Sequence, residues 1–595
     1  MRTRHSLCCA ALTFLPEVLL GQGFAVLDVN NIHARFHADG MIGLSPGIGQ
    51  PNFEVPAGSG VHALFAAHLW MGGYDAGNQL RGAAVRFGQV GSDWFPGPLT
   101  TDGSASITPT VSAQYDRLWK VTSADVGLYQ AYCACVNDPG CDEAVVYPGY
   151  QIPQDFTDWP AHGDVQAGQA YTLAPFLDAN GDGAYALSDC DAPCSPGDGA
   201  LYFIFNDKLA PHTESGCLPV GVEVQTTAFA YSGPDAALAN TVFVQYRLIN
   251  RGTLTLSDFH LGLFTDLDLG CADDDYLGCD VGRSLWYVYN GDALDEPCNG
   301  HLGYGPQPPA FGVSVLCGLH CDPDGTDHVQ DSALVAFNGF GSGDGIIDNE
   351  RHGLGHFMRF ENSGSATGDP TTCAEYHHLM RGFWRDGLPL TYGGNGYGGT
   401  IPARFVYPGD SDPLGLGTDG LPQPAWNEVT AGNAPFDRRG MGSMGPITLQ
   451  PGAVHRIVLA FVHAGAGPGG LFSSVEALQA RVDSIRAFAS ANGFCDGLAN
   501  DVPCLASTVG LAEVPPVQHD LELFPVPAGS MVEFRASSEL IGALLTIHDA
   551  FGRIVQEQRV TSGSERIGIG SLAAGVYTCV VTTPRARHTG RFVKQ

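Results

Sequence analysis

The sequence predicts an all-β protein built from several antiparallel β-sandwiches, with one or two helices and an immunoglobulin-like module at the C-terminus. Three observations support this class. The 595 residues include 79 glycines and 39 prolines, which favour short strands joined by many turns over helical bundles. Short segments of alternating apolar residues recur along the chain, and only one long segment has apolar residues at helical spacing. The length is sufficient for roughly three or four domains.

The N-terminus has the pattern of an export signal. Arg2 and Arg4 precede an apolar stretch from Leu7 to Leu20, which is too short to span a bilayer and is followed by small residues. We therefore expect residues 1–22 to be a signal peptide for Sec export. No later segment has the ~18 consecutive apolar residues of a membrane helix, so no transmembrane segment is expected.

Strand and turn patterns divide the body of the chain. Residues 23–215 are predicted to form a β-rich region, in which residues 61–87 are a hairpin that turns at Asp75 to Asn78. Residues 216–470 are predicted to form a central β-sandwich region. Three spans within it are expected to be consecutive antiparallel strands: Val222 to Tyr231, Thr241 to Asn250 and Phe259 to Asp266.

An amphipathic helix is predicted at residues 471–495. Its apolar residues recur at helical spacing, and they are Val475, Leu478, Val482 and Ile485. Ser473 and Glu476 fit a capping box at its start. A shorter helix is expected to begin at Ser123, and residues 505–519, with two adjacent prolines, are expected to be a linker.

Residues 520–595 have the pattern of a small all-β module with short alternating strands between turn residues. The opening Leu523 to Pro527, the hairpin His548 to Val555 and the segment Leu572 to Tyr577 resemble the C-terminal sorting domain of the type IX (Por) secretion system. Members of that family usually carry Asn between the two prolines of the opening, where this chain has Val526. The resemblance implies export by the type IX machinery to the outer cell surface or the extracellular space, after Sec export to the periplasm.

Motifs in the body of the chain resemble the same class of protein. They are Phe53 to Pro56, Leu69 to Gly73, Trp159 to Asp164, Asp274 to Asp280 and Asp437 to Met441. These segments are similar to large Bacteroidota proteins that carry type IX sorting domains, and the likeness spans most of residues 50–465. It implies a location and an architecture, and it brings no known activity.

The charge of the chain excludes one class of partner. There are 62 acidic residues against 29 basic ones, which gives a formal net charge of −33. Such a surface repels the phosphates of nucleic acids and anionic membranes, and it attracts divalent cations. Nucleic acid is therefore not expected as a ligand.

The cysteines suggest disulfides of an oxidising compartment. Two of the 17 fall in the predicted signal peptide and one in the sorting module, which leaves 17 − 2 − 1 = 14, an even number. Zinc is the alternative for short spacings, but no double CxxC pattern occurs. The close pairs expected to form bridges are Cys190 with Cys194, Cys271 with Cys279, Cys317 with Cys321 and Cys495 with Cys504.

The segment Asp178 to Asp189 has the spacing of a calcium loop. Oxygen donors occur at positions 1, 3, 5 and 12, a glycine occupies position 6, and position 7 offers a backbone carbonyl. Pro175 and Pro193 argue against the flanking helices of an EF-hand, so the loop resembles those of dockerins or thrombospondin type 3 repeats. A solvated turn is the alternative. The expected ligands of a structural Ca²⁺ are Asp178, Asn180, Asp182, Ala184 and Asp189.

Two further acidic clusters are tentative metal sites. Their residues are Asp266, Asp268, Asp274, Asp280, Asp344, Asp348 and Glu350. The first four lie at a strand end and in the following turn, where so many carboxylates call for a counter-ion. Asp344 stands before a glycine and is followed by the other two acids, but Phe340 stands where a first calcium ligand belongs. Plain solvated turns are the alternative for both.

Catalytic signatures are weak. Residues 43–47 match GxSxG by letter, but the proline after the serine cannot donate the N–H of an oxyanion hole. His352 and His356 lie four apart, yet the glycines between them argue against a helix that would bring both to one metal. His377 and His378 are adjacent, so we expect them to point apart and to be ordinary polar histidines. No catalytic residue is expected.

Two functions remain. The first is a secreted or surface-attached protein, stabilised by calcium, that acts in adhesion or another interaction with a surface glycan or protein and has no catalytic role. In this case Trp384, Tyr392 and Tyr397 could stack on a sugar. The alternative is an extracellular hydrolase of polysaccharide or protein. Two carboxylates at glycosidase spacing, or three histidines around a cation, would favour the enzyme.

Overall fold

The computed structural model describes residues 23–45, 49–328, 339–467 and 469–495, and it describes residues 517–520, 523–535, 540, 543–548, 554–562, 564–582 and 586–595 nearer the C-terminus. The chain divides into two units, residues 1–507 and residues 508–595. The predicted signal peptide lies outside the described residues, as does the predicted linker before residue 517.

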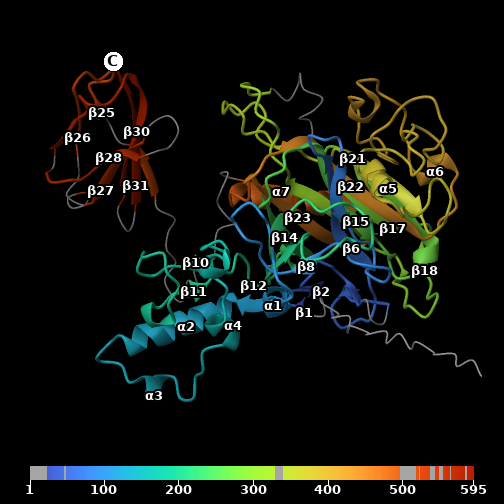
Figure 1. Cartoon of the computed structure of the whole chain (residues 1–595), viewed down its shortest axis with the longest axis horizontal. Coiled ribbons are helices and arrows are strands. Elements are labelled where there is room, and N and C mark those ends of the chain that lie inside the picture. Colours follow the sequence, from blue (N-terminus) through green and yellow to red (C-terminus); the bar gives the residue numbers. More distant parts are fainter. Residues whose placement is uncertain are drawn as a thin grey trace, which may run out of the picture. The chain divides into compact units, whose positions relative to one another are not determined.

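Two antiparallel sheets form most of the first unit (Figure 1). The nine-stranded sheet has the order β16-β17-β20-β23-β14-β13-β12-β8, with β9 also paired to β12. Its strands are β8 (Phe95–Pro96), β9 (Trp119–Thr122), β12 (Gly199–Asn206), β13 (Val222–Ala230), β14 (Thr241–Asn250), β16 (Asp275–Asp280), β17 (Leu285–Asn290), β20 (Ala310–Cys317) and β23 (Val454–Ala464). The five-stranded sheet has the order β21-β22-β15-β6-β7, and its strands are β6 (Ala66–Tyr74), β7 (Leu80–Ala84), β15 (Leu256–Asp266), β21 (His356–Glu361) and β22 (Arg438–Leu449).

Shorter elements surround these sheets. The small strands are β1 (Phe24–Leu27), β2 (His33–His37), β3 (Leu44–Ser45), β4 (Gln50–Pro51), β5 (Phe53–Glu54), β10 (Phe176–Leu177), β11 (Ala192–Pro193), β18 (Leu294–Asp295) and β19 (Gly305–Pro306). The helices are α1 (Pro109–Gln114), α2 (Ser123–Val136), α3 (Glu143–Val146), α4 (Gln154–Thr157), α5 (Cys373–Met380), α6 (Glu428–Ala431) and α7 (Ser473–Ala491). The 3₁₀ turns are η1 (Val165–Ala167), η2 (Leu187–Asp189), η3 (Leu238–Asn240), η4 (Ala272–Asp274) and η5 (Leu416–Thr418).

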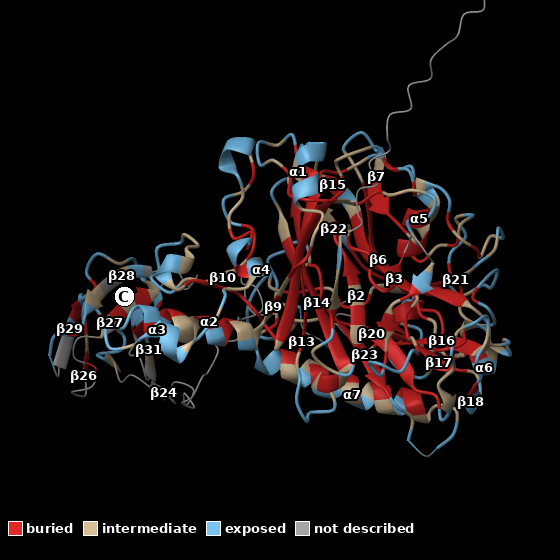
Figure 2. Cartoon of the chain, turned by 90° about the horizontal axis from the view of Figure 1, so that it is seen from below, coloured by how far each residue is buried: buried red, intermediate tan, exposed pale blue. Residues whose placement is uncertain are grey.

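The strands of the nine-stranded sheet are largely buried (Figure 2), and apolar residues lie on both of its faces. Because successive side chains of a strand point to opposite faces, Leu201 and Phe203 of β12 enter the core shared with the five-stranded sheet, whereas Tyr202 and Ile204 enter a second core. Helix α7 covers that second face and packs on β20 and β23. The predicted apolar stripe of α7 is buried, and the all-β class is confirmed.

The hairpin of β6 and β7 turns where predicted, with Asn78 at a φ of 57°. Three other local expectations differ from the structure. Strand β15, however, does not pair with β14, because it crosses to the five-stranded sheet and pairs with β6 and β22. The predicted boundary after residue 215 falls inside one sheet, since β12 pairs with β13 across it. Helix α7 has Phe472 at its N-cap with no side-chain cap, so the capping box is absent.

Disulfides join cysteines far apart in the sequence more often than the close pairs that were expected. The bridges are Cys133–Cys190, Cys135–Cys141, Cys217–Cys373 and Cys271–Cys298, and Cys194 is also disulfide-bonded. The expected pairs of Cys190 with Cys194, Cys271 with Cys279 and Cys317 with Cys321 are therefore wrong. Cys279 does not pair with Cys271, which is bonded to Cys298. The thiol of Cys279 is buried on β16 and lies 3.3 Å from the carbonyl oxygen of Val406. Cys504 lies outside the described residues.

The second unit is a small two-sheet module. One sheet has the order β24-β31-β30-β27-β28 and the other β25-β26-β29. The strands are β24 (Val517–Asp520), β25 (Leu523–Phe524), β26 (Met531–Arg535), β27 (Leu544–His548), β28 (Ile554–Arg559), β29 (Ser564–Gly568), β30 (Gly575–Thr582) and β31 (Ala586–Lys594). The module has its own core, which includes Val532, Ile547 and Cys579. Because β24 pairs with β31, the end of the predicted linker belongs to the module.

No helix in the described parts of the chain has the length and apolar character needed to cross a membrane.

Candidate functional site

The candidate site lies at one end of the five-stranded sheet. Asp266 is the last residue of β15 and pairs in register with Arg439, the second residue of β22. Because the two strands run antiparallel, Asp437, just before β22, lies at the same end as Asp266 and Asp268. The sheet thus brings together carboxylates that are about 170 residues apart in the sequence.

Three of these carboxylates converge. Oxygen atoms of Asp266, Asp268 and Asp437 all lie within 4.8 Å of one another. They face a pocket of about 380 Å³, which falls in the size range of small-ligand sites. The pocket, called the acidic pocket below, is lined by Phe65, Arg86, Phe87, Gln89, Asp266, Asp268, Asn362, Asp369, Asp437 and Arg439.

Arg439 is the central cation of the acidic pocket. Its guanidinium nitrogens lie 3.5 Å from Asp266, 3.7 Å from Asp369 and 3.6 Å from Asp437. These are ion pairs, but each distance is too long for a good hydrogen bond. The guanidinium carbon also lies 5.4 Å from the ring centre of Phe87, so a cation–π contact supports it from one side.

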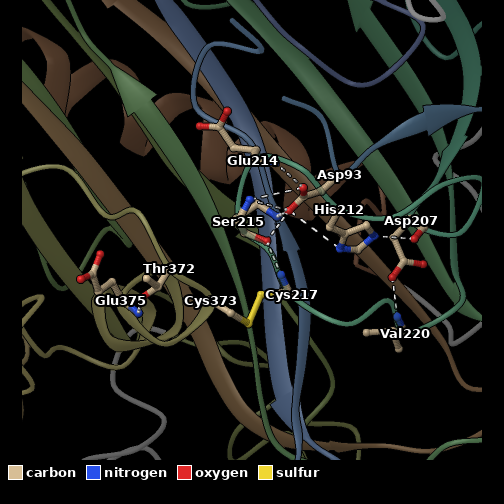
Figure 3. The surroundings of a disulfide bond; sticks show 11 residues. Asp93, Asp207, His212, Glu214, Ser215, Cys217, Val220, Thr372, Cys373 and Glu375 are labelled. Atoms are coloured by element: carbon tan, nitrogen blue, oxygen red, sulfur yellow. Dashed lines mark hydrogen bonds and ion pairs between the residues drawn. A yellow bond between two sulfur atoms is a disulfide. The ribbon is translucent and has the colours of Figure 1, made fainter. Parts of the chain in front are cut away.

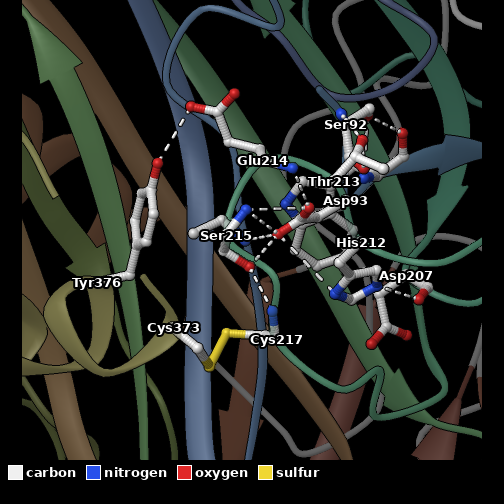
Figure 4. Close-up of polar contacts among 12 residues, drawn as sticks. Ser92, Asp93, Asp207, His212, Thr213, Glu214, Ser215, Cys217, Cys373 and Tyr376 are labelled. Atoms are coloured by element: carbon white, nitrogen blue, oxygen red, sulfur yellow. Dashed lines mark hydrogen bonds and ion pairs between the residues drawn. A yellow bond between two sulfur atoms is a disulfide. The ribbon is translucent and has the colours of Figure 1, made fainter. Parts of the chain in front are cut away.

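A second cation, Arg86, is fixed from behind. Its Nε lies 3.1 Å from Glu214, and its Nη1 lies 3.2 Å from Asp369 of the pocket. Figure 4 shows the hydroxyl of Tyr376 directed at Glu214, to which it donates a hydrogen bond of 3.1 Å. Tyr376 belongs to α5, so this helix and the pocket are joined by one chain of polar contacts.

The loop that carries Glu214 is held by buried polar groups and a disulfide (Figure 3). Asp93 accepts N–H groups from Ala84 at 3.0 Å and Glu214 at 3.1 Å, and it also accepts the hydroxyl of Ser215. His212 has its Nε2 2.6 Å from the carbonyl oxygen of Asp207. Serine, histidine and aspartate therefore meet here, but the serine donates to the aspartate and not to the histidine. The arrangement is structural and does not activate a nucleophile.

The same loop is tied to α5 by the disulfide between Cys217 and Cys373, the first residue of the helix. The Cα atoms of this pair lie 4.9 Å apart, and the bridge spans 156 residues of sequence. Helix α5 is thus fixed at its start by the disulfide and along its length by Tyr376.

Several buried atoms of the acidic pocket have no hydrogen-bond partner among the described residues. They are Asp266 Oδ1, Asp369 Oδ1, Asp437 Oδ1, Arg439 Nε and Arg439 Nη1. Asp266 and Arg439 are almost fully buried, at 3% and 5% exposure. Buried polar groups without partners are costly, and in native proteins they usually meet water, an ion or a ligand.

The charges of the pocket do not balance. Four carboxyl groups, those of Asp266, Asp268, Asp369 and Asp437, face the two guanidinium groups of Arg86 and Arg439. Burial raises the pKa of Asp266 to about 7, in spite of the opposing attraction of Arg439. Burial and the nearby Asp266 raise the pKa of Asp268 well above its usual range, and burial also raises the pKa of Asp437. A bound cation would remove this penalty.

Only two of the four residues predicted at this strand end contribute to the acidic pocket. Asp280 is 1% exposed and is satisfied by Arg283 at 2.8 Å and Gln479 at 2.9 Å. Asp274 lies in a separate group, where burial and Asp295 raise its pKa to about 7. Sequence reasoning missed Asp369, Asp437 and Arg439, although the Asp437 to Met441 segment had been singled out as a motif.

The predicted calcium loop has the conformation of a compact Asx-rich turn. The carboxylate of Asp178 accepts the N–H groups of Gly181 at 2.7 Å and Gly183 at 2.8 Å, and these hydrogen bonds lower the pKa of Asp178. The amide nitrogen of Asn180 lies 3.0 Å from Asp182 and 3.2 Å from Asp189. Positions 3, 5 and 12 of the expected ligand set are therefore neighbours in space.

Buried Asp191 fixes both ends of this loop. Its two carboxylate oxygens each accept a backbone N–H at 2.8 Å, one from Ala179 and one from Ala186. Ala184, whose carbonyl was expected as a ligand, donates its own N–H to Asp182 at 2.8 Å. The adjoining Cys190 is bonded to Cys133 of α2, so the loop is attached to the helix beside it.

The loop around Asp344 repeats this pattern with a carboxylate from elsewhere. Asp327 accepts the N–H groups of Gly343 and Gly345, both at 2.7 Å, as Asp178 does from its two glycines. Asp344 accepts from Ile346 at 2.8 Å. Toward these two glycines Asp327 thus lies as Asp178 does toward Gly181 and Gly183. Asp348 and Glu350 bind other groups, namely the N–H of Asp324 at 2.8 Å and the N–H of His328 at 2.7 Å.

The aromatic residues proposed for sugar stacking do not form an exposed platform. Trp384 is fully buried, and its Nε1 donates to the carbonyl oxygen of Gly396 at 3.0 Å. Tyr397 is 36% exposed, and its hydroxyl donates to Asp386 at 2.7 Å. The indole of Trp384 is thus a core group and is not available to a sugar.

Comparison with known families decides the identity of the second unit. Residues 522–595 match the family model described as a secretion system C-terminal sorting domain. The chain carries a type IX sorting domain. The protein is therefore exported to the cell surface or the extracellular space, and its sorting domain implies contact with the type IX machinery. Within the sorting domain, Val526 is 49% exposed, so the departure from the usual Asn costs no core contact.

Other comparisons add no activity. A search of curated proteins found no match to the chain. Among solved structures, a polysaccharide lyase is similar with a TM-score of 0.18 and 8% identity, over 62% of this chain and 34% of that one. An amine oxidase of Aspergillus nidulans is similar with a TM-score of 0.26 and 8% identity, over 80% of this chain and 57% of that one. The chain thus spans less than two thirds of either protein.

Proposed function

We propose that the exported protein is a calcium-stabilised surface protein that binds a polar ligand, most suitably a glycan, through a cation held in the acidic pocket, and that it has no catalytic role. The observation that carries this proposal is the convergence of Asp266, Asp268 and Asp437, whose oxygens lie within 4.8 Å of one another. Asp437 Oδ1 has no hydrogen-bond partner among the described residues, and Asp266 Oδ1 has only the 3.5 Å ion pair with Arg439. Ca²⁺ takes six to eight oxygen ligands, as a general rule, and carboxylates are among its preferred ones.

The pocket would leave part of the ion's coordination open. Asp266, Asp268 and Asp437 supply three carboxylates. The remaining positions would go to water or to oxygens of a ligand, and the hydroxyls of a glycan are oxygens of this kind. Because the ion pairs of Arg439 with Asp266 and Asp437 are as long as 3.5 and 3.6 Å, a small movement would let its guanidinium contact an acidic group of the same ligand.

This proposal is tested with the mature full-length chain on a glycan array, in Ca²⁺ and in chelator. We expect binding only in Ca²⁺. Asp268→Asn should weaken it at least about tenfold, since a charged contact contributes roughly 1.5–3 kcal/mol. Asp419→Asn is the matched control, because it removes the same charge from an exposed loop. Equal binding by both variants would place the ligand elsewhere.

The pH dependence of binding follows from Asp266. Its pKa is about 7 in the folded protein and about 3.9 in an unfolded chain, so between these values the folded state holds the extra proton. Protons therefore compete with the cation below pH 7, and without the cation this group makes the fold less stable as the pH rises from about 4 to about 7. Calcium-dependent binding should weaken as the pH falls from 8 to 5.5.

Calcium at the Asp178 loop is proposed as a separate, structural site. Extracellular modules of this kind bind with Kd of ~10⁻⁴ to 10⁻³ M, so ~10 mM Ca²⁺ would stabilise the fold by about 1.4 to 2.7 kcal/mol. Asp182→Ala should lower the Tm clearly more in Ca²⁺ than in chelator, where it removes only exposed hydrogen bonds within the turn. The Asp344 loop, a second calcium candidate, is the same in both proteins. An equal loss of Tm with and without the ion would remove this site.

A second candidate, an extracellular hydrolase, is favoured by one observation. The oxygens of Asp266, Asp268 and Asp437 lie within 4.8 Å of one another, which is nearer the ~5–5.5 Å of retaining glycosidases than the wider spacing of inverting ones. A carboxyl group with a pKa of about 7 is also suited to act as a general acid. If the protein releases reducing ends from a glycan and Asp266→Asn abolishes this release, then hydrolysis replaces binding as the function of the acidic pocket.

A further inference from the structure

A second group of potential ligands lies at the other end of strand β15. Asp258 and His260 belong to the start of β15, and His377 belongs to α5. One ligand atom from each lies within 4.8 Å of the other two. Eight residues of extended strand, or roughly 26 Å, separate Asp258 from Asp266 of the acidic pocket, so the two groups are distinct.

Local backbone features create this arrangement. The pairing of β15 with β6 shifts between Ser257 and His260, and Asp258 adopts a φ of 51°, in the left-handed region. A bulge of this kind redirects side chains at the edge of a regular ladder, and such features often accompany functional sites. Asp258 and His260 are two residues apart and meet the helix that carries His377.

Helix α5 is positioned firmly enough to present His377. The disulfide of Cys373 holds its first residue, and the hydroxyl of Tyr376 is bonded to Glu214 (Figures 3 and 4). The ring of His377 lies against Gly72 of β6, where an added Cβ would come within 2.9 Å of Cδ2 of the imidazole. The glycine thus provides the space that the ring occupies.

His377 lacks the partners of an ordinary buried histidine. It is 1% exposed, and the contact that its ring makes with a described residue is a poorly aligned one with the backbone of Asp258, which falls short of good hydrogen-bond geometry. Burying such groups without partners costs roughly 1–3 kcal/mol each. Three other histidines also have two buried ring nitrogens without a hydrogen-bond partner among the described residues, namely His37, His320 and His463. Within the described parts of the chain, none of these three belongs to a group of three potential metal ligands.

The neighbouring groups are arranged as around a metal. The Nδ1 atom of His260 lies 3.1 Å from the carbonyl oxygen of Asp258, a contact that fixes the ring and leaves Nε2 with its lone pair. Arg381 binds one carboxylate oxygen of Asp258 at 3.0 Å and orients the other.

We propose that Asp258, His260 and His377 bind a first-row transition-metal ion of the zinc class. Two imidazoles and one carboxylate are a ligand set that zinc accepts, whereas Ca²⁺ prefers oxygen alone. Three protein ligands leave a fourth position for water or a ligand, and the side chain of Asp258, 31% exposed, provides access from solvent.

The test uses the mature full-length chain, stripped of metal by a chelator and titrated with Zn²⁺ against a chromogenic competitor. We expect one tight site per chain, and Co²⁺ in its place should give visible absorption bands of a nitrogen- and oxygen-ligated ion. His377→Ala should weaken Zn²⁺ binding by about 100-fold or more, since even partners outside the ligand set contribute about 10–100-fold. His378→Ala, which changes the next residue of the same helix, should bind like the wild type.

Folding is controlled with a second variant. Asp258→Asn keeps the shape of the side chain, and asparagine tolerates a positive φ, so this variant should fold and still lose at least about tenfold in affinity. Tryptophan fluorescence reports on the fold of the first unit, which holds all seven tryptophans. The proposal is overturned by the absence of a tight site, by equal losses in His377→Ala and His378→Ala, or by wild-type affinity in Asp258→Asn.

Discussion

Removal of residues 508–595 is expected to stop the protein from reaching the cell surface and to leave it in the periplasm. These residues form a unit with its own sheets and core, and residues 522–595 match the sorting domain. The first unit has a separate core, so it should remain folded after the truncation. Surface protease treatment and fractionation of cells that express each form measure the result.

A point variant controls this experiment. Val526→Asn restores the residue usual in the family at an exposed position, and it should be exported as well as the wild type. Surface yield of the truncated chain equal to that of the complete chain would contradict the assignment of the export signal to this domain.

Loss of the Cys217–Cys373 disulfide is expected to give the largest effect on stability. The bridge closes a loop of 156 residues, for which the loss of unfolded-chain entropy amounts to about 5 kcal/mol. It also fixes the start of α5, which carries Tyr376 and His377. The double variant Cys217→Ser/Cys373→Ser should therefore unfold at much lower denaturant concentration, as measured by tryptophan fluorescence, and should bind Zn²⁺ more weakly.

The control for this variant removes a disulfide of much smaller span. Cys135 and Cys141 are only 6 residues apart, and the same reasoning gives about 2 kcal/mol for their bridge. Cys135→Ser/Cys141→Ser should leave Zn²⁺ binding unchanged, because α2 does not carry ligands of that site. Equal destabilisation by the two double variants would contradict the role given to α5 anchoring.

Local patterns in the sequence predicted local structure well. The stripe from Val475 to Ile485 is buried on the sheet as its helical spacing indicates, because periodicity records which face meets the core. The predicted cap of α7 was wrong, since Phe472 takes the N-cap position and its ring packs against that of Tyr289, with ring centres 5.5 Å apart. Strand β29 has little alternation in the sequence, because Ser564 to Gly568 contains one large apolar residue, Ile567.

The candidate sites depend on contacts between distant segments, which spacing does not encode. Asp437 meets Asp266 only because β22 pairs with β15 in one register. Asp327 reaches the loop of Asp344 from outside the run of residues that a calcium motif covers. His377 was expected to be an ordinary histidine because its neighbour in the sequence is also histidine, whereas its partners Asp258 and His260 lie on another element.

The most direct test of the central claim is a crystal structure of the mature protein grown or soaked in Ca²⁺, with the anomalous signal of the ion measured at the acidic pocket. We predict an ion bound by carboxylate oxygens of Asp266, Asp268 and Asp437 at 2.3–2.6 Å, the usual range for Ca²⁺, with Arg439 displaced toward the pocket mouth. A pocket without an anomalous peak, in which Arg439 instead forms direct hydrogen bonds to these three carboxylates, would contradict it.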